Sequence, residues 1–137
     1  MIDLLVYGTL REGGRLRPFY KLTTVETGLV LLGYTMVDVS NNRKVYPIAV
    51  ENEGTEIIVD HVQVDENHFV NLNAMEAGAG YHVIKVPHPV TGKECRMFVH
   101  NRETIDFSKK TLIRDWIQYV ESEILESPVT VRDAQPL

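Results

Sequence analysis

The sequence predicts an α+β fold whose mixed, mostly antiparallel sheet curls into a small barrel. Strand-like runs follow one another with gaps of mostly hairpin length, which favours pairing between strands that are neighbours in the sequence. Apolar residues at helical spacing occur in one short internal stretch and in one stretch near the end of the chain. Because strands and helices do not alternate, the pattern disfavours a doubly wound parallel sheet. We expect one short internal helix and one C-terminal helix beside the sheet.

The expected strands are apolar runs bounded by glycine, proline or polar turn residues. The first, residues 3–7, ends at Gly8 and leads into a loop that reaches Gly14. The others span residues 25–32, 34–39, 45–50, 56–64, 81–86 and 94–100. Breaks between these strands are expected at Gly33, at Ser40-Asn41-Asn42, at Gly54 and at residues 87–92.

Two helices complete the pattern. Asp65 is expected to cap the first helix, in which Phe69, Leu72 and Glu76 share a helical line, and Gly78 is expected to close it. The second helix ends at Pro128 and carries one apolar stripe, made of Ile113, Trp116, Ile117, Val120 and Ile124. We expect a single domain over residues 1–126 and a flexible tail over residues 127–137.

Composition excludes several classes of protein. The 137 residues, 44% of them hydrophobic, suit one globular domain. The net charge of -5 argues against a nucleic-acid partner, which usually requires a basic face. No apolar run approaches the roughly 18 residues of a membrane span, and the first residues lack a basic secretory start. Cys95 is the single cysteine, so we expect no internal disulfide and a cytoplasmic location. The sequence does not define an oligomeric state.

Familiar motifs for cofactors and nucleophiles are absent. The loop after the first strand lacks the Gly-Lys-Ser/Thr of a phosphate loop, and no Gly-x-Ser-x-Gly elbow occurs. The five histidines are scattered and none forms a His-x-x-x-His pair, so a metal site would need ligands from distant positions. Cys95 paired with a histidine is a further candidate nucleophile, but a lone cysteine in a strand is more often a buried hydrophobe. We therefore expect no metal and no cofactor.

The first candidate site is the segment Tyr7-Gly8-Thr9-Leu10-Arg11. A buried strand runs directly into a glycine, which permits a positive φ and a close approach of the backbone to a ligand. The amides that follow can then face an anion. The same residues are also compatible with a plain turn between a strand and a loop.

The second candidate is Glu76, on the same helical line as Phe69 and Leu72. A carboxyl on a core-facing line loses hydration, and the negative end of the helix dipole acts in the same direction, so both raise its pKa. Such a group can exchange protons near neutral pH, as general acid–base catalysis requires. The alternative is a glutamate at the edge of the apolar line whose carboxylate reaches water.

Together, the two candidates resemble the γ-glutamylcyclotransferase-like family, which includes the γ-glutamylamine cyclotransferases. The resemblance extends from about residue 4 to residue 119 and depends on the order and spacing of several short motifs. They are Tyr7-Gly8-Thr9-Leu10 with Arg11 and Gly13, Tyr46-Pro47, the segment from Leu72 through Glu76 to Tyr81, and Asp115-Trp116.

The chain also departs from the family pattern. Asn73 replaces the usual Asp, and Ala77 occupies the place of the Gly that normally follows the glutamate. Val83 replaces a frequent Arg, and Arg114 replaces the Gly before Asp-Trp. None of these changes removes Glu76 or the loop. The loss of an Arg at position 83 leaves the charge of the substrate open.

The resemblance implies a lactam-forming acyl transfer on a small-molecule γ-glutamyl substrate, without metal or cofactor. The α-amine of the γ-glutamyl group attacks its own γ-carbonyl, giving 5-oxoproline and a free amine. Glu76 would act as general base and then as general acid. The residues implied to bind substrate are Tyr7, Gly8, Thr9, Leu10, Arg11 and Tyr81. Two other functions remain open: a non-catalytic ligand-binding module on the same fold, and hydrolytic removal of a γ-glutamyl group.

Overall fold

The computed structural model describes residues 1–39, 47–101, 103 and 111–126. In chain order the elements are β1 (Ile2–Val6), the 3₁₀ turn η1 (Arg17–Phe19), β2 (Thr23–Asp38), β3 (Pro47–Val64), α1 (Glu66–Gly78), β4 (His82–Pro87), β5 (Glu94–Val99) and α2 (Trp116–Glu126). The predicted turn at residues 40–42 and the predicted tail at residues 127–137 lie outside the described residues.

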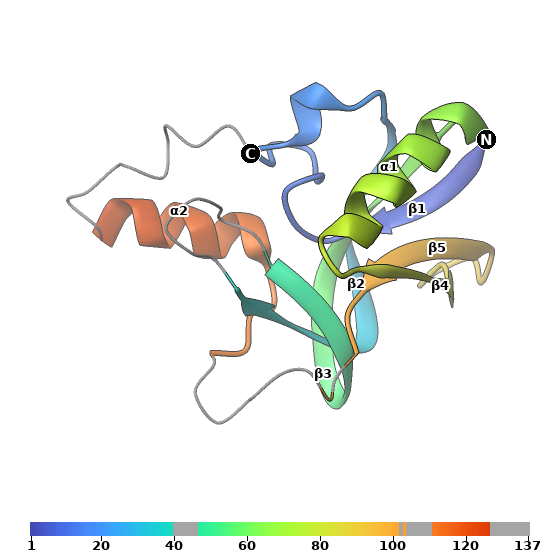
Figure 1. The fold of residues 1–137 in the computed structure, drawn as a ribbon. Helices are drawn as coiled ribbons and strands as arrows, with labels where there is room; N and C mark the ends of the chain where they lie inside the picture. Colours follow the sequence, from blue (N-terminus) through green and yellow to red (C-terminus); the bar gives the residue numbers. More distant parts are fainter. Residues whose placement is uncertain (40–46, 102, 104–110, 127–137) are drawn as a thin grey trace.

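The strands form one five-stranded sheet in the order β2-β3-β1-β5-β4. β1 lies at its centre, antiparallel to β3 and parallel to β5, and the other pairs are antiparallel. The predicted α+β fold with a mixed, mostly antiparallel sheet is therefore confirmed. Among the described strands the sheet does not close into a barrel, because β2 and β4 are its two edges (Figure 1).

Two predicted strand breaks are wrong, because β2 and β3 are long, bent strands that each combine two expected ones. Gly33 and Gly54 both have φ of 88°, and neither ends its strand. The register between β2 and β3 shifts at Leu32/Tyr34, beside Gly33. An extra residue in a strand bends it locally, and a glycine with positive φ is well suited to that position. The two glycines therefore mark irregularities within a paired ribbon and not turns.

Alternation along β1 places its side chains on both faces of the sheet. Leu4 and Val6 join a cluster with Phe69 and Leu72 of α1, which covers one face. Leu5 and Tyr7 join a second cluster on the other face, which includes Trp116 of α2. In Figure 1, α1 lies beside β1 and β5, whereas α2 lies at the other end of the molecule. The segment after β1 therefore begins between two packed layers.

The ends of α1 have well-defined caps. Asp65 is the N-cap, as predicted, and its carboxylate accepts a hydrogen bond from the His68 amide at 2.8 Å. At the other end the prediction needs a correction, because Gly78 is the last helical residue and Gly80 has the positive φ, 91°. The Tyr81 amide donates to the Glu76 carbonyl and the Gly80 amide to the Ala77 carbonyl, both at 3.0 Å. This pair of bonds is a Schellman motif.

The predicted stripe of the last helix also needs a correction. α2 begins at Trp116, and Ile113 lies before it in a short β-bridge with Met36. Asp115 precedes the helix, and its carboxylate accepts a hydrogen bond from the Gln118 amide at 3.2 Å. None of the helices in the described ranges is long and apolar enough to cross a membrane.

Candidate functional site

A cavity of about 340 Å³ opens between the loop after β1 and the C-terminal end of α1. Its volume falls within the usual range for small-molecule sites, roughly 300–1,000 Å³. Six of the seven predicted site residues line it, namely Tyr7, Gly8, Thr9, Leu10, Glu76 and Tyr81. Most of the remaining lining is apolar and comes from Leu5, Val6, Leu16, Pro47, Met75, Gly78, Ala79 and Phe98, together with Arg15. The cavity thus brings together two segments that are seventy residues apart in the sequence.

Glu76 reaches the cavity from the last turn of α1. The line that begins with Phe69 and Leu72, which are 6% and 2% exposed, ends at this partly buried glutamate. Burial raises the pKa of Glu76 from 4.5 to about 7. At that pKa the carboxyl group is part ionised and part protonated at neutral pH, so it can both accept and donate a proton.

The hydroxyl groups of the two tyrosines in the cavity wall form hydrogen bonds with the protein backbone. Tyr7 donates to the Phe98 carbonyl at 2.6 Å and accepts from the Ala49 amide at 3.2 Å, and burial raises its pKa. Tyr81 donates to the Pro47 carbonyl at 2.5 Å, and its ring meets the ring of His100 edge-on. Both side chains therefore fix the shape of the wall. The backbone of Tyr81 is also held to that of Glu76 by the Schellman motif.

Gly8 does not adopt the positive φ that the sequence led us to expect, whereas Gly13 in the same loop has φ of 83°. A β-carbon at position 8 would instead lie 2.5 Å from Cγ of Pro47, the first residue of β3. Glycine is therefore required here by the close packing of Pro47 against the loop.

The loop folds back on itself after Gly8. The Leu16 amide donates to the Thr9 carbonyl at 2.9 Å, and the Gly14 amide donates to the Arg11 carbonyl at 2.7 Å. None of the described residues accepts a hydrogen bond from the amides of Thr9 or Leu10. These two residues line the cavity, and backbone amides without an acceptor can donate to an anion that they face.

Arg11 is the one predicted site residue that does not line the cavity, and its side chain has another task. Its Nε lies 3.3 Å from a carboxylate oxygen of Asp60, and its Nη1 lies 3.0 Å from one of Asp115. Asp60 is fully buried and also accepts hydrogen bonds from the amides of Glu12 and Gly28. Arg11 thus ties the loop to β3 and to the start of α2, and a role in binding substrate is not supported.

Arg15 is a cavity residue that the sequence motifs did not single out. It lines the same cavity, and its Nη2 atom is buried without a hydrogen-bond acceptor among the described residues. The only signal in the sequence is a basic residue after the pair Gly13-Gly14. That signal does not distinguish it from Arg11 or Arg17.

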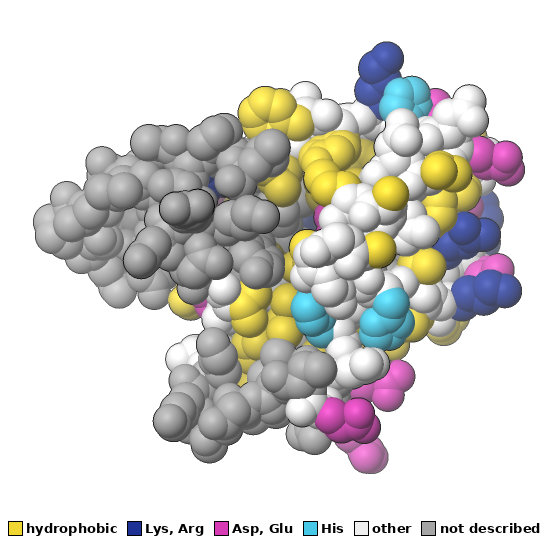
Figure 2. All heavy atoms as spheres, in the orientation of Figure 1, with side chains coloured by type: hydrophobic (Ala, Val, Ile, Leu, Met, Phe, Trp, Pro, Cys, Tyr) yellow, Lys and Arg dark blue, Asp and Glu magenta, His cyan; other side chains and the backbone are white. Residues whose placement is uncertain are grey.

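The surface around the cavity is apolar. Figure 2 shows hydrophobic side chains gathered on the face between η1 and α1. Exposed hydrophobic residues on these elements include Phe19, Val70 and Met75. The hydroxyl of Tyr20, which follows η1, contacts the sulfur of Met75 on α1. This contact links the segment after η1 to α1.

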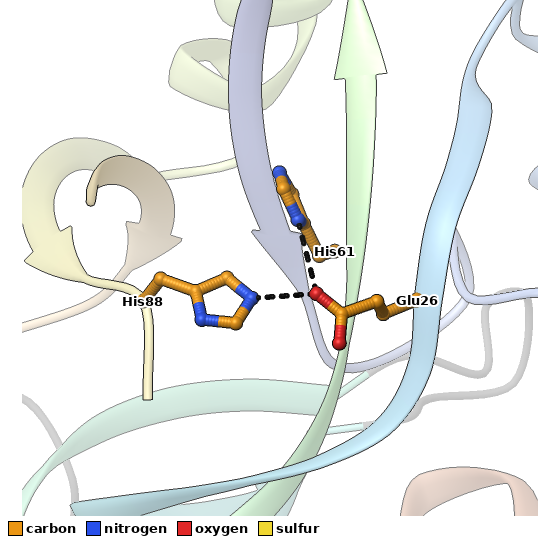
Figure 3. Close-up of side chains that lie close together, drawn as sticks. All are labelled: Glu26, His61 and His88. Atoms are coloured by element: carbon orange, nitrogen blue, oxygen red, sulfur yellow. Dashed lines mark hydrogen bonds and ion pairs between the residues drawn. The ribbon is translucent and has the colours of Figure 1, made fainter. Parts of the chain in front are cut away.

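A second cluster of polar side chains lies away from this cavity (Figure 3). Glu26 of β2, His61 of β3 and His88 after β4 place potential ligand atoms within 4.8 Å of one another. A carboxylate oxygen of Glu26 lies 3.0 Å from Nε2 of His88 and 3.9 Å from Nδ1 of His61.

The tautomer of His88 argues against a metal ion in this cluster. Its Nδ1 accepts hydrogen bonds from the amides of Val90 and Thr91, both at 3.1 Å, so the proton of the neutral ring is on Nε2. That Nε2–H then donates to Glu26 and has no lone pair for a metal. His61 uses its Nε2 on Asp3 at 2.8 Å. The cluster is best described as a hydrogen bond between Glu26 of β2 and His88 of the β4–β5 hairpin, with His61 of β3 beside it at 3.9 Å.

Cys95 does not contribute to either cluster. It is 1% exposed in the core, and burial raises the pKa of its thiol. It is not among the residues that line the cavity. The alternative of a Cys–His nucleophilic pair therefore gains no support from the structure.

The fold and the cavity define a small α+β protein with a partly buried carboxyl group in a ligand-sized pocket. The model of the γ-glutamyl cyclotransferase, AIG2-like family matches residues 4–118. The chain therefore belongs to the AIG2-like γ-glutamyl cyclotransferase family, as the motifs indicated. No curated protein sequence gives a significant match.

Solved structures show the same fold at low sequence identity. The uncharacterized protein PH0828 from Pyrococcus horikoshii is 22% identical with a TM-score of 0.68, over 94% of this chain and 100% of that one. The uropathogenic E. coli-specific protein c4763 is 20% identical with a TM-score of 0.68, over 88% and 95% of the two chains. A structure named gamma-glutamyl cyclotransferase is 13% identical with a TM-score of 0.62, over 98% and 85%.

Proposed function

We propose that the protein converts a small-molecule γ-glutamyl amine or γ-glutamyl peptide into 5-oxoproline and a free amine, with Glu76 as general base and then general acid. Membership of a γ-glutamyl cyclotransferase family supports the reaction class. The observation that carries the assignment of Glu76 is its place in the cavity, opposite the Tyr7–Leu10 loop, with a pKa of about 7.

In the proposed reaction, the α-amine nitrogen forms a bond to the γ-carbonyl carbon, and the bond from that carbon to the leaving nitrogen breaks. Two protons leave the attacking ammonium nitrogen and two reach the leaving nitrogen, so the released amine departs as an ammonium ion without net proton uptake. Glu76 carries these two protons one at a time, accepting each from the attacking nitrogen and donating it to the leaving nitrogen. Because both nitrogens belong to one folded substrate, positioning alone supplies much of the rate.

The remaining cavity residues have roles that follow from their contacts. The amides of Thr9 and Leu10 are available to stabilise the oxyanion that develops on the γ-carbonyl. Tyr7 and Tyr81 shape the wall. The proposal needs no metal or cofactor. It includes a cytoplasmic location, which the single, buried Cys95 supports.

Product analysis tests the proposal directly. The protein is incubated with γ-glutamyl amino acids, γ-glutamyl amines and glutathione, and the products are separated by chromatography. Cyclisation gives 5-oxoproline and the amine, even after exhaustive chelation. Release of glutamate would instead support hydrolysis, and binding without any product would support a ligand-binding module.

A further inference from the structure

The loop after β1 presents a cation to the cavity that the proposed reaction has not used. Among the described residues that line the cavity, Arg15 is the cation and Glu76 is the acid. The Nη2 atom of Arg15 is inaccessible to solvent and has no hydrogen-bond acceptor among the described residues. A buried donor on a charged group without an acceptor is unfavourable, and a turn of the guanidinium toward an anion in the cavity would remove this unfavourable contribution.

The fold of the loop accounts for the position of Arg15. The Leu16 amide bonds to the Thr9 carbonyl, and Gly14 lies so close to that carbonyl that a β-carbon at position 14 would overlap it. The residue between Gly14 and Leu16 is therefore held beside Thr9. Arg15 and the residues Thr9 and Leu10, whose amides have no acceptor among the described residues, therefore come from one loop and line one cavity.

The neighbouring arginines show that the unpaired nitrogen is not a general property of this loop. Arg11 is paired with Asp60 and Asp115. Arg17 donates to the carbonyls of Leu10 and Leu22 and to the hydroxyl of Thr24. Both therefore hold the loop in place, whereas Arg15 retains a donor for something outside the protein chain.

We propose that Arg15 binds the α-carboxylate of the γ-glutamyl group and thereby positions the attacking amine. A planar guanidinium matches a carboxylate through two parallel hydrogen bonds. The α-carboxylate and the α-ammonium are attached to the same carbon, so a carboxylate held by Arg15 fixes the carbon whose nitrogen must reach Glu76. The other described lining groups are apolar or neutral and provide no second cation for this carboxylate. The inference rests on the proposed function for the identity of the ligand.

Binding measurements on the Glu76→Gln protein test this assignment without turnover. The probes for calorimetry are γ-glutamylalanine, its analogue with the α-carboxylate replaced by a carboxamide, and its analogue with the alanine carboxylate replaced by a carboxamide. A hydrogen bond to a charged group contributes about 1.5–3 kcal/mol, so loss of the α-carboxylate should weaken binding by about tenfold to a hundredfold. Loss of the alanine carboxylate should change binding much less.

Two substitutions in the Glu76→Gln protein identify the residue responsible. Arg15→Met keeps the apolar stem and removes the charge, and should abolish the preference for the α-carboxylate. Arg15→Lys keeps the charge without the planar fork and should retain a reduced preference, which also covers the case in which the methionine variant does not fold. Lys21→Met removes a nearby exposed cation and should leave the preference intact.

Turnover by the wild-type protein, measured in parallel, separates this inference from the proposed function. If no 5-oxoproline forms but the α-carboxylate preference depends on Arg15, the cyclisation proposal fails and the carboxylate site stands. If 5-oxoproline forms but the preference survives Arg15→Met, the assignment of Arg15 is overturned. A preference that follows the alanine carboxylate, or absence of binding by all three probes, also overturns it.

Discussion

The ring of Pro47 occupies the space that a side chain at position 8 would need. A β-carbon on Gly8 would lie 2.5 Å from Cγ and 3.0 Å from Cδ of that ring. The carbonyl of the same proline accepts the hydrogen bond from Tyr81. Pro47 therefore positions the glycine loop and the tyrosine that follows α1, on two sides of the cavity.

We expect Gly8→Ala to destabilise the protein by about 1–3 kcal/mol, the usual effect of an added methyl group in a packed site. Pro47→Ala should relieve part of this, so that the double variant is more stable than the sum of the single changes predicts. Urea unfolding of the four proteins gives the coupling energy. Gly78→Ala is the control, because no atom lies within 4 Å of its built β-carbon and alanine favours the helix. Additive effects would show that the contact with Pro47 does not constrain position 8.

Glu76→Gln should nearly abolish formation of 5-oxoproline while ligand binding is largely kept. The amide has the size of the carboxyl group but cannot take a proton, and loss of general acid–base catalysis lowers rates by about 10²–10⁴-fold. Steady-state kinetics with 5-oxoproline detection measures the effect. A near-normal rate would falsify the assignment of Glu76 as the catalytic base.

The pH dependence of activity should follow the same carboxyl group. Burial raises its pKa to about 7, so kcat/KM should rise about tenfold per pH unit below that value and level off above it. Initial rates between pH 5 and pH 9 define the profile. An inflection near pH 4.5, the ordinary value for a glutamate, would indicate that the catalytic group is solvated or is a different residue.

Stability should depend on pH in the opposite direction. A raised pKa means that the folded state binds the Glu76 proton more firmly than the unfolded state does, so this contribution is complete below pH 4.5 and is lost as the pH rises to about 7. The loss is at most about 3–4 kcal/mol, because the pKa is raised from 4.5 to about 7 and each pKa unit corresponds to about 1.36 kcal/mol. The difference in unfolding free energy between Glu76→Gln and wild type isolates it, and the variant should be relatively more stable above pH 7.

Arg11→Met should affect stability and not substrate recognition. Removing one partner of a buried ion pair leaves a buried charge, and we expect a loss of about 3 kcal/mol or more. Urea unfolding measures this loss of unfolding free energy. Arg15→Met is the matched control, because it removes an arginine from the same loop without breaking an ion pair between described residues. If Arg11→Met kept full stability but raised KM strongly, the ion pair with Asp60 would not be its main role.

The sequence motifs located the cavity well but did not define every wall residue. Six of the seven site residues that the family resemblance implied line the cavity, and the strand and the helix that carry them were both expected from their apolar patterns. The motifs did not distinguish Arg11 from Arg15, since three arginines occur in one short loop. The direction of the Arg11 side chain depends on Asp60 and Asp115, which are distant in the sequence.

The fold class was predictable for a similar reason, and the strand lengths were not. Gly33 and Gly54 are typical of turns when only the neighbouring residues are considered. Their role as irregularities inside paired strands depends on the ladder between β2 and β3, which continues on both sides of them. The position of Ile113 likewise depends on its bridge to Met36, a partner far away in the chain.

The central place of β1 has a consequence for how the chain acquires its structure. Ile2 pairs with Val64, and Leu4 pairs with Arg96, so β1 needs partners that are synthesised long after it. Such distant pairings lose chain entropy when the long loops close, before the strand contacts contribute any stabilisation, and this slows folding. During synthesis on the ribosome, the cavity beside the Tyr7–Leu10 loop therefore cannot be complete until β5, which contributes Phe98 to its wall, has been made.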